Sequence, residues 1–120
     1  MLSLTPATAI WLATAPTDMR LGFDGLAALV RTALGANPLS GQLFVFLGRR
    51  ADRVKILWWD RDGLALYAKR LERGTFRRPA VAGARVSLTP AELAMLLEGI
   101  DLVGARRRKR ITTDKYNMIT

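Results

Sequence analysis

Arginine and lysine are the residues whose number and spacing point most directly to a chemistry in this sequence. The chain carries 19 of them against 10 acidic residues, for a formal net charge of +9. They are concentrated in two blocks: residues 49–85 hold eleven basic and four acidic side chains, and residues 106–120 hold six basic and one acidic. A clustered positive surface is typical of a protein that binds a polyanion, most often nucleic acid. The competing interpretation is a solvated face that keeps a small protein in solution.

Guanidinium and ammonium groups donate hydrogen bonds to phosphate oxygens, so both blocks are candidates for contact with a DNA backbone. The residues expected to contact DNA are Arg49, Arg50, Arg53, Lys55, Arg61, Lys69, Arg70, Arg73, Arg77, Arg78, Arg106, Arg107, Arg108, Lys109 and Arg110.

Catalytic and metal chemistry find little support in the composition. The sequence has no cysteine and no histidine, which removes thiolate zinc sites, the commonest general base and the commonest metal ligand. Aspartates could hold a divalent metal, but Asp60 and Asp62 suit a tight turn, and Asp18 suits a partner for Arg20. We therefore expect a non-enzymatic protein with no catalytic residue, no metal and no cofactor.

The aromatic side chains allow a second kind of nucleic-acid contact, because aromatic rings can stack on unpaired bases. Alternating aromatic residues in strands are more often core residues, and we expect most of these to be buried. The set is Phe44, Phe46, Trp58, Trp59, Tyr67 and Phe76.

The stretch 43–76 must position the first basic block. Its apolar runs are residues 43–47, 54–59 and 64–71. They are short and rich in Val, Ile, Leu and aromatics, which predicts three strands in an antiparallel meander at the centre of a sheet. The break at 60–63 is typical of a tight turn, and the break at 48–53 is a longer loop with three arginines. Because residues 43–47 are all apolar, this strand is expected to be covered on both faces.

Two helices and two further strands are expected outside the meander. Residues 9–14 and 86–88 resemble short strands. Apolar residues from 26 to 34 follow helical spacing, with Asp24 as the expected N-cap.

A second helix is predicted after residue 89. Thr89 and Glu92 have the spacing of a capping box, and Pro90 suits the first helical position. The fold class is therefore α+β: an antiparallel sheet of about four to five strands with two amphipathic helices packed on one face.

The length of 120 residues is that of one domain. We expect a single α+β domain over residues 1–104 and a basic flexible tail over residues 105–120. The sequence contains no apolar run of about 18 residues, and no basic residue precedes Arg20 as a signal peptide would require. A cytoplasmic location without membrane contact is expected.

Five blocks in fixed order resemble one known family. They are DMRLGFDGL at 18–26, LFVFLGRR at 43–50, LWWD at 57–60, KRLERGTF at 69–76 and LTPAELAMLLEGID at 88–101. Together they resemble the TnpB accessory proteins, the product of the second open reading frame of IS66-type bacterial insertion sequences. The resemblance covers about residues 5–101. It implies a role in transposition beside two other proteins, with the strand-transfer chemistry in the large partner, TnpC.

The sequence departs from the pattern of that family at a few positions. Leu47 stands where a basic or polar residue is common, and Arg78 and Leu102 stand where Trp is common. The residues after Gly104 are unlike those of most members, so no tail function is carried over.

The resulting expectation is a non-enzymatic accessory protein for DNA transposition that contacts DNA through a basic patch. One alternative is an adapter that recruits or regulates the catalytic transposase without binding DNA, and another is an RNA-binding regulator. The expected partners are element ends or nonspecific duplex DNA and the other transposition proteins of the same element, with a homo-oligomer left open.

Overall fold

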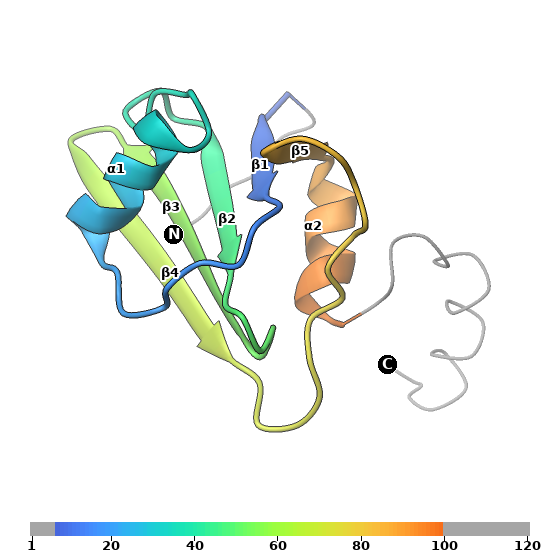
Figure 1. Ribbon diagram of the computed structural model, residues 1–120. Coiled ribbons are helices and arrows are strands. Elements are labelled where there is room, and N and C mark those ends of the chain that lie inside the picture. The colour runs from blue at the N-terminus through green and yellow to red at the C-terminus, as the bar shows by residue number, and fades with distance from the viewer. Residues whose placement is uncertain (1–6, 100–120) are drawn as a thin grey trace.

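The computed structural model of the protein describes residues 7–99. The elements of this part are β1 (Ile10–Ala13), α1 (Phe23–Thr32), β2 (Leu43–Leu47), β3 (Arg53–Asp60), β4 (Gly63–Arg70), β5 (Arg85–Leu88) and α2 (Pro90–Leu97). The strands form one sheet in the order β4-β3-β2-β1-β5, and the two helices lie on its two sides (Figure 1). The α+β class is therefore confirmed.

The predicted meander is confirmed, because β2 pairs antiparallel with β3 and β3 pairs antiparallel with β4. It runs from the middle strand of the sheet, β2, to the β4 edge, and so forms one half of the sheet rather than its centre. The other half is built by β1, which pairs parallel with β2 and antiparallel with β5. One parallel pair arises because the chain between β1 and β2 crosses over through α1, as parallel neighbours require.

The helices pack on opposite faces of the sheet, and the expectation that both lie on one face is wrong. The reason is β2, whose five residues are all buried. Alternate side chains of this strand point to opposite faces, so Val45 belongs to the cluster under α2, while Phe44 and Phe46 belong to the cluster under α1. A strand that is apolar on both faces needs cover on both, and each helix supplies one layer.

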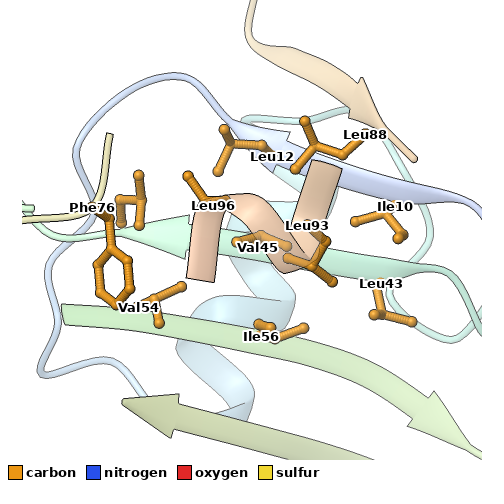
Figure 2. Packing of buried hydrophobic residues seen from close by; sticks show 11 residues of the cluster. Ile10, Leu12, Leu43, Val45, Val54, Ile56, Phe76, Leu88, Leu93 and Leu96 are labelled. Carbon is orange, nitrogen blue, oxygen red and sulfur yellow. The ribbon is translucent and has the colours of Figure 1, made fainter. Parts of the chain in front are cut away.

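The cluster on the α2 face is shown in Figure 2, where Leu93 and Leu96 of α2 lie over Val45 of β2. Phe76, from the segment after β4, closes one end of this cluster and is 2% exposed. Full burial of an apolar side chain of this size stabilises the fold by about 1.5–3 kcal/mol. The cluster therefore fixes both α2 and the segment that carries Phe76 to the sheet.

The two helices begin differently. At α2 the capping box is confirmed: the Thr89 hydroxyl accepts from the Glu92 backbone N–H at 3.1 Å, and the Glu92 carboxylate accepts from the Thr89 N–H at 2.8 Å. At α1 the N-cap is Gly22, whose carbonyl accepts from the Leu26 N–H, and the expectation that Asp24 caps the helix is wrong. Asp24 instead lies in the first turn, where its charge still favours the positive helix end.

Within residues 7–99, neither helix is long and apolar enough to cross a bilayer.

Candidate nucleic-acid interface

The first basic block gathers where β2 ends, β3 begins and β4 ends; we call this region the basic end of the sheet. The antiparallel register places Arg53 opposite Arg70 and Val54 opposite Lys69. The loop between β2 and β3 leaves the same end and carries Arg49 and Arg50, both exposed. Residues separated by up to 21 positions in the sequence are thus brought to one end of the molecule by the hairpins.

Residues 71–78, which we call the strap, fold back across this loop. The Leu71 N–H donates to the Asp52 carbonyl at 2.8 Å, and the Phe76 N–H donates to the Ala51 carbonyl at 2.6 Å. Figure 1 shows the segment after β4 passing the tip of the β2–β3 hairpin. Because Phe76 is anchored in the core, the strap adds the exposed Arg73 and Arg77 to the basic end in a fixed position.

The opposite side of the loop is held by residues 16–19. The Thr17 N–H donates to the Leu47 carbonyl at 2.9 Å. The Met19 side chain lies so close to Gly48 that a Cβ there would come within 2.7 Å of its Cγ. A side chain at position 48 would therefore displace Met19, and glycine allows the two segments to approach.

Two open hollows lie side by side at the basic end. The larger, of about 650 Å³, lies between residues 16–19 and the loop, and the smaller, of about 460 Å³, lies along the start of β3 and the end of β4. They share Met19 and Arg53 in their walls. Six cationic and three anionic side chains line the pair of hollows, so the surface is positive overall.

Most cations of the basic end are free of ion pairs. In the described part of the chain, ion pairs join Arg20 to Asp18 at 2.8 Å, Arg61 to Asp60 at 3.9 Å and Arg70 to Glu72 at 3.4 Å. The basic-end cations that take part in none of these pairs are Arg49, Arg50, Arg53, Lys69, Arg73 and Arg77. Their charge is available to an external anion.

Arg53 and Arg70 face each other directly across the β3–β4 pair. Side chains in this relation are about 5 Å apart at their Cβ atoms, and like charges there destabilise a sheet by up to about 1 kcal/mol. Glu72 offsets the charge of Arg70 only in part, because the two charged groups are 3.4 Å apart and both side chains are exposed to solvent. A phosphate between the two guanidinium groups would convert this repulsion into attraction.

Three of the residues singled out in the sequence either lie apart from the other cations or donate to a backbone carbonyl. Arg61 lies in the β3–β4 turn, at the opposite end of two eight-residue strands and about 25 Å away at the usual rise per residue. The Lys55 ammonium donates to the Leu21 carbonyl at 2.8 Å and so fixes the chain before α1. The Arg78 guanidinium donates to the Gly48 carbonyl at 2.7 Å and supports the loop from inside.

Arg78 is half-buried, and burial lowers its pKa from the ordinary value. Its Nη1 is buried and has no hydrogen-bond partner among residues 7–99. We therefore place Arg78 among the residues that position the loop, not among those that face the solvent. The predicted contacts at Arg106, Arg107, Arg108, Lys109 and Arg110 lie outside the described residues.

The aromatic residues divide between core and surface. Phe44, Phe46 and Phe76 are buried, as expected, and Trp58 packs partly against the cluster under α2. Tyr67, on β4, is 39% exposed. A base-stacking platform therefore has little aromatic surface to use at the basic end.

Among residues 7–99, no group of three or more carboxylate, imidazole or thiol side chains is arranged to hold a metal ion. The features of this end are those of a positively charged surface.

The sequence of the chain matches a known protein family. Residues 8–107 match the model of the family described as IS66 Orf2 like protein. The chain belongs to the IS66 Orf2-like family. Membership gives the protein an accessory role in transposition, beside the other transposition components and distinct from the catalytic transposase.

Two relatives of this IS66 Orf2-like protein come from Sinorhizobium fredii (strain NBRC 101917 / NGR234). The protein y4hO is 48% identical over 92 residues, which cover 77% of this chain and 80% of the relative. The protein y4jC is 40% identical over 99 residues, which cover 82% of this chain and 85% of the relative. No solved structure matches the chain significantly.

Two features of this IS66 Orf2-like protein were missed from the sequence. Residues 16–19 form one wall of the larger hollow, although the predicted site started at residue 49. The block DMRLGFDGL at 18–26 was a usable signal, because it was part of the family resemblance and had not been connected with the basic residues. The second feature is Arg85, whose guanidinium lies 4.2 Å from the centre of the Trp11 ring; no local sequence signal marks this pair.

Proposed function

We propose that this IS66 Orf2-like protein serves transposition by binding the phosphate backbone of duplex DNA with the basic end of its sheet. The observation that carries the proposal is the set of six cations that the fold brings to one end and leaves without ion pairs to any other described residue. They come from the β2–β3 loop, the start of β3, the end of β4 and the strap.

The chemistry favours backbone contact over base reading. Arginine and lysine that reach phosphate oxygens fix the position of a protein on DNA but carry little sequence information. Each phosphate neutralised steepens the fall of log K with log salt by about 0.9, so six contacts would give a slope of about −5. We therefore expect binding with little sequence preference and a strong dependence on salt.

The rigidity of the loop supports the same proposal. Backbone bonds from Thr17, Leu71 and Phe76 and the side-chain bond from Arg78 hold the loop on both sides. A loop fixed in this way keeps Arg49 and Arg50 at one edge of the hollow, so less conformational entropy is lost on binding. The place of action is the cytoplasm, where such a protein would meet both the element DNA and the transposase.

The alternative is an adapter that recruits or regulates the transposase. It draws support from exposed apolar side chains, such as Phe23 at 49% and Leu39 at 46% exposure. These residues are single exposed side chains, which are common on protein surfaces, so the DNA proposal is preferred.

Fluorescence anisotropy with labelled duplexes separates the two roles. The protein alone is titrated into a duplex from the element ends and into a shuffled duplex of equal length, and both titrations are repeated with the catalytic transposase present. The proposal predicts that the protein alone binds both duplexes with similar affinity. Binding that appears only with the transposase would favour the adapter, and stronger competition by single-stranded RNA than by duplex would favour an RNA-binding regulator.

A further inference from the structure

In the part of the chain that the structure describes, the outer edge of β4 is the longest unpaired backbone edge of the sheet. β4 has eight residues and, in the described part of the chain, one neighbouring strand, β3. The other edge strand, β5, has four residues. An edge strand presents a row of free N–H and C=O groups, which another strand can pair with.

Proteins commonly protect such edges with charges, prolines, bulges or a covering segment. In β4 the residues from Gly63 to Ala68 include no charge and no proline, and charge appears only at Lys69 and Arg70. The register with β3 is regular over all eight pairs, so no bulge twists the edge away. Tyr67 adds an exposed aromatic ring to this strand.

We propose that two copies of the protein associate through their β4 edges, paired antiparallel about a two-fold axis that passes between the two Leu66 residues. A two-fold axis perpendicular to the sheet keeps each face of one copy continuous with the same face of the other. Directly opposite residues must then share a face, which restricts the register to one centred on a residue.

Charge and shape select Leu66 as the centre. In this register Leu66 meets its own copy, Leu64 meets Ala68, and Ala65 meets Tyr67, so the middle of the interface is apolar throughout. At each end, Asp62 of one copy lies opposite Arg70 of the other. Two Asp–Arg pairs thus close the two ends of the interface.

The neighbouring register, centred on Tyr67, lacks this complementarity. It places Ala65 opposite Lys69 and Leu64 opposite Arg70, so apolar side chains would face cations at both ends. Asp62 is available to pair with Arg70 of the other copy, because it is exposed in the β3–β4 turn and takes part in no ion pair of the described residues. The pairing does not depend on DNA binding.

A charge swap tests the pairing by sedimentation velocity over the micromolar range in the absence of DNA. Wild-type protein is expected to show a concentration-dependent monomer–dimer equilibrium. In a dimer of Asp62→Arg, two arginines face each other at each end of the interface. In a dimer of Arg70→Asp, two carboxylates face each other at each end. Each single variant is expected to raise the dimer dissociation constant about tenfold or more, because attraction becomes repulsion at both ends.

An equal mixture of the two variants is the decisive sample. Each end of the mixed dimer again joins one cation and one carboxylate, so the dissociation constant should return to near the wild-type value. The matched control, Arg61→Asp, changes charge in the same turn without facing Arg70 and should leave the equilibrium nearly unchanged. Circular dichroism verifies that each variant is folded.

Wild-type protein that stays monomeric throughout the concentration range would overturn the proposal. This holds even if the β4 edge pairs with a strand from another protein. A dimer that both single variants leave intact, or that the mixture fails to restore, would equally contradict this interface.

Discussion

At the scale of single residues, charge at the basic end is arranged by short local contacts. Asp18 accepts from the Arg20 side chain at 2.8 Å and from the Arg20 backbone N–H at 2.9 Å. The side-chain bond from Arg20, followed by the backbone bond, lowers the pKa of Asp18 from 3.8 to about 2. The carboxylate beside the larger hollow is thereby neutralised by its own neighbour, and the cations of the loop keep their charge for a ligand.

The lowered pKa predicts a defined pH dependence. A carboxyl whose pKa is lower in the folded than in the unfolded state adds stability above its ordinary pKa, and this is lost as the pH falls through about 2. Arg20→Gln should raise the Asp18 pKa toward 3.8. A ¹³C NMR titration of the side-chain carboxyl measures it. Arg31→Gln, on α1, is the control and should leave the Asp18 pKa unchanged; an unchanged value in Arg20→Gln would contradict the assignment.

Ala51 gives a second prediction at this scale. Its φ of 59° lies in the left-handed region, which costs a residue with a Cβ roughly 1–2 kcal/mol. Its conformation is fixed because its N–H donates to the Gly48 carbonyl and its carbonyl accepts from the Phe76 N–H. Ala51→Gly should raise the free energy of unfolding by about 0.5–1 kcal/mol in urea denaturation, after the entropy cost of glycine is subtracted.

The control for Ala51 is Ala68→Gly, at a regular position in β4. That substitution should lower the free energy of unfolding by about 0.5–1 kcal/mol, because glycine weakens a strand without relieving strain. Destabilisation by both substitutions would show that the backbone at residue 51 is not strained.

At the scale of elements, local patterns predicted the strands and helices but not how they are assembled. Alternation in 54–59 and the capping box at Thr89 act within a few residues, so they could be recognised directly. The parallel pairing of β1 with β2 and the separation of the helices to two faces depend on contacts across the whole chain. The apolar pattern of 43–47 already required two covered faces, which contradicted the placement of both helices on one.

In the candidate site, too, local features could be predicted from the sequence and long-range contacts could not. The three arginines of the loop were predicted from one short stretch, but the contact of the strap with that loop joins residues far apart in sequence. The distance of Arg61 from the other cations could have been derived from the predicted hairpin, because its turn and the 48–53 loop lie at opposite ends of β3. The internal role of Arg78 depends on burial, which an isolated arginine does not reveal.

The capping box of α2 predicts the effect of a single hydroxyl. Thr89→Ala removes the acceptor for the Glu92 N–H and should lower the free energy of unfolding by about 1 kcal/mol in urea denaturation. Ser87→Ala, at an exposed position of β5, is the control and should change it by less than about 0.5 kcal/mol. Equal effects of the two substitutions would argue against a contribution from the cap.

At the scale of the whole molecule, the sheet separates two surfaces along the β3–β4 hairpin. One end carries the unpaired cations and the strap, and the other carries the turn at residues 60–63 with its own carboxylates. Because of this separation, the effect of the net charge on DNA binding can be measured separately from the effect of where the charges lie. Both Arg31 and Arg61 are exposed and lie away from the basic end, so their removal changes the net charge by the same amount as removal of Arg49 and Arg50.

The central claim, that the basic end binds the DNA backbone, is tested most directly by the salt dependence of duplex binding. The double variant Arg49→Ala/Arg50→Ala is compared with Arg31→Ala/Arg61→Ala by fluorescence anisotropy over a series of salt concentrations. The first should bind more weakly and reduce the slope of log K against log salt by about 2, and the second should resemble wild type. Equal slopes and affinities for the two variants would show that the placement of these arginines is irrelevant, and the claim would fail.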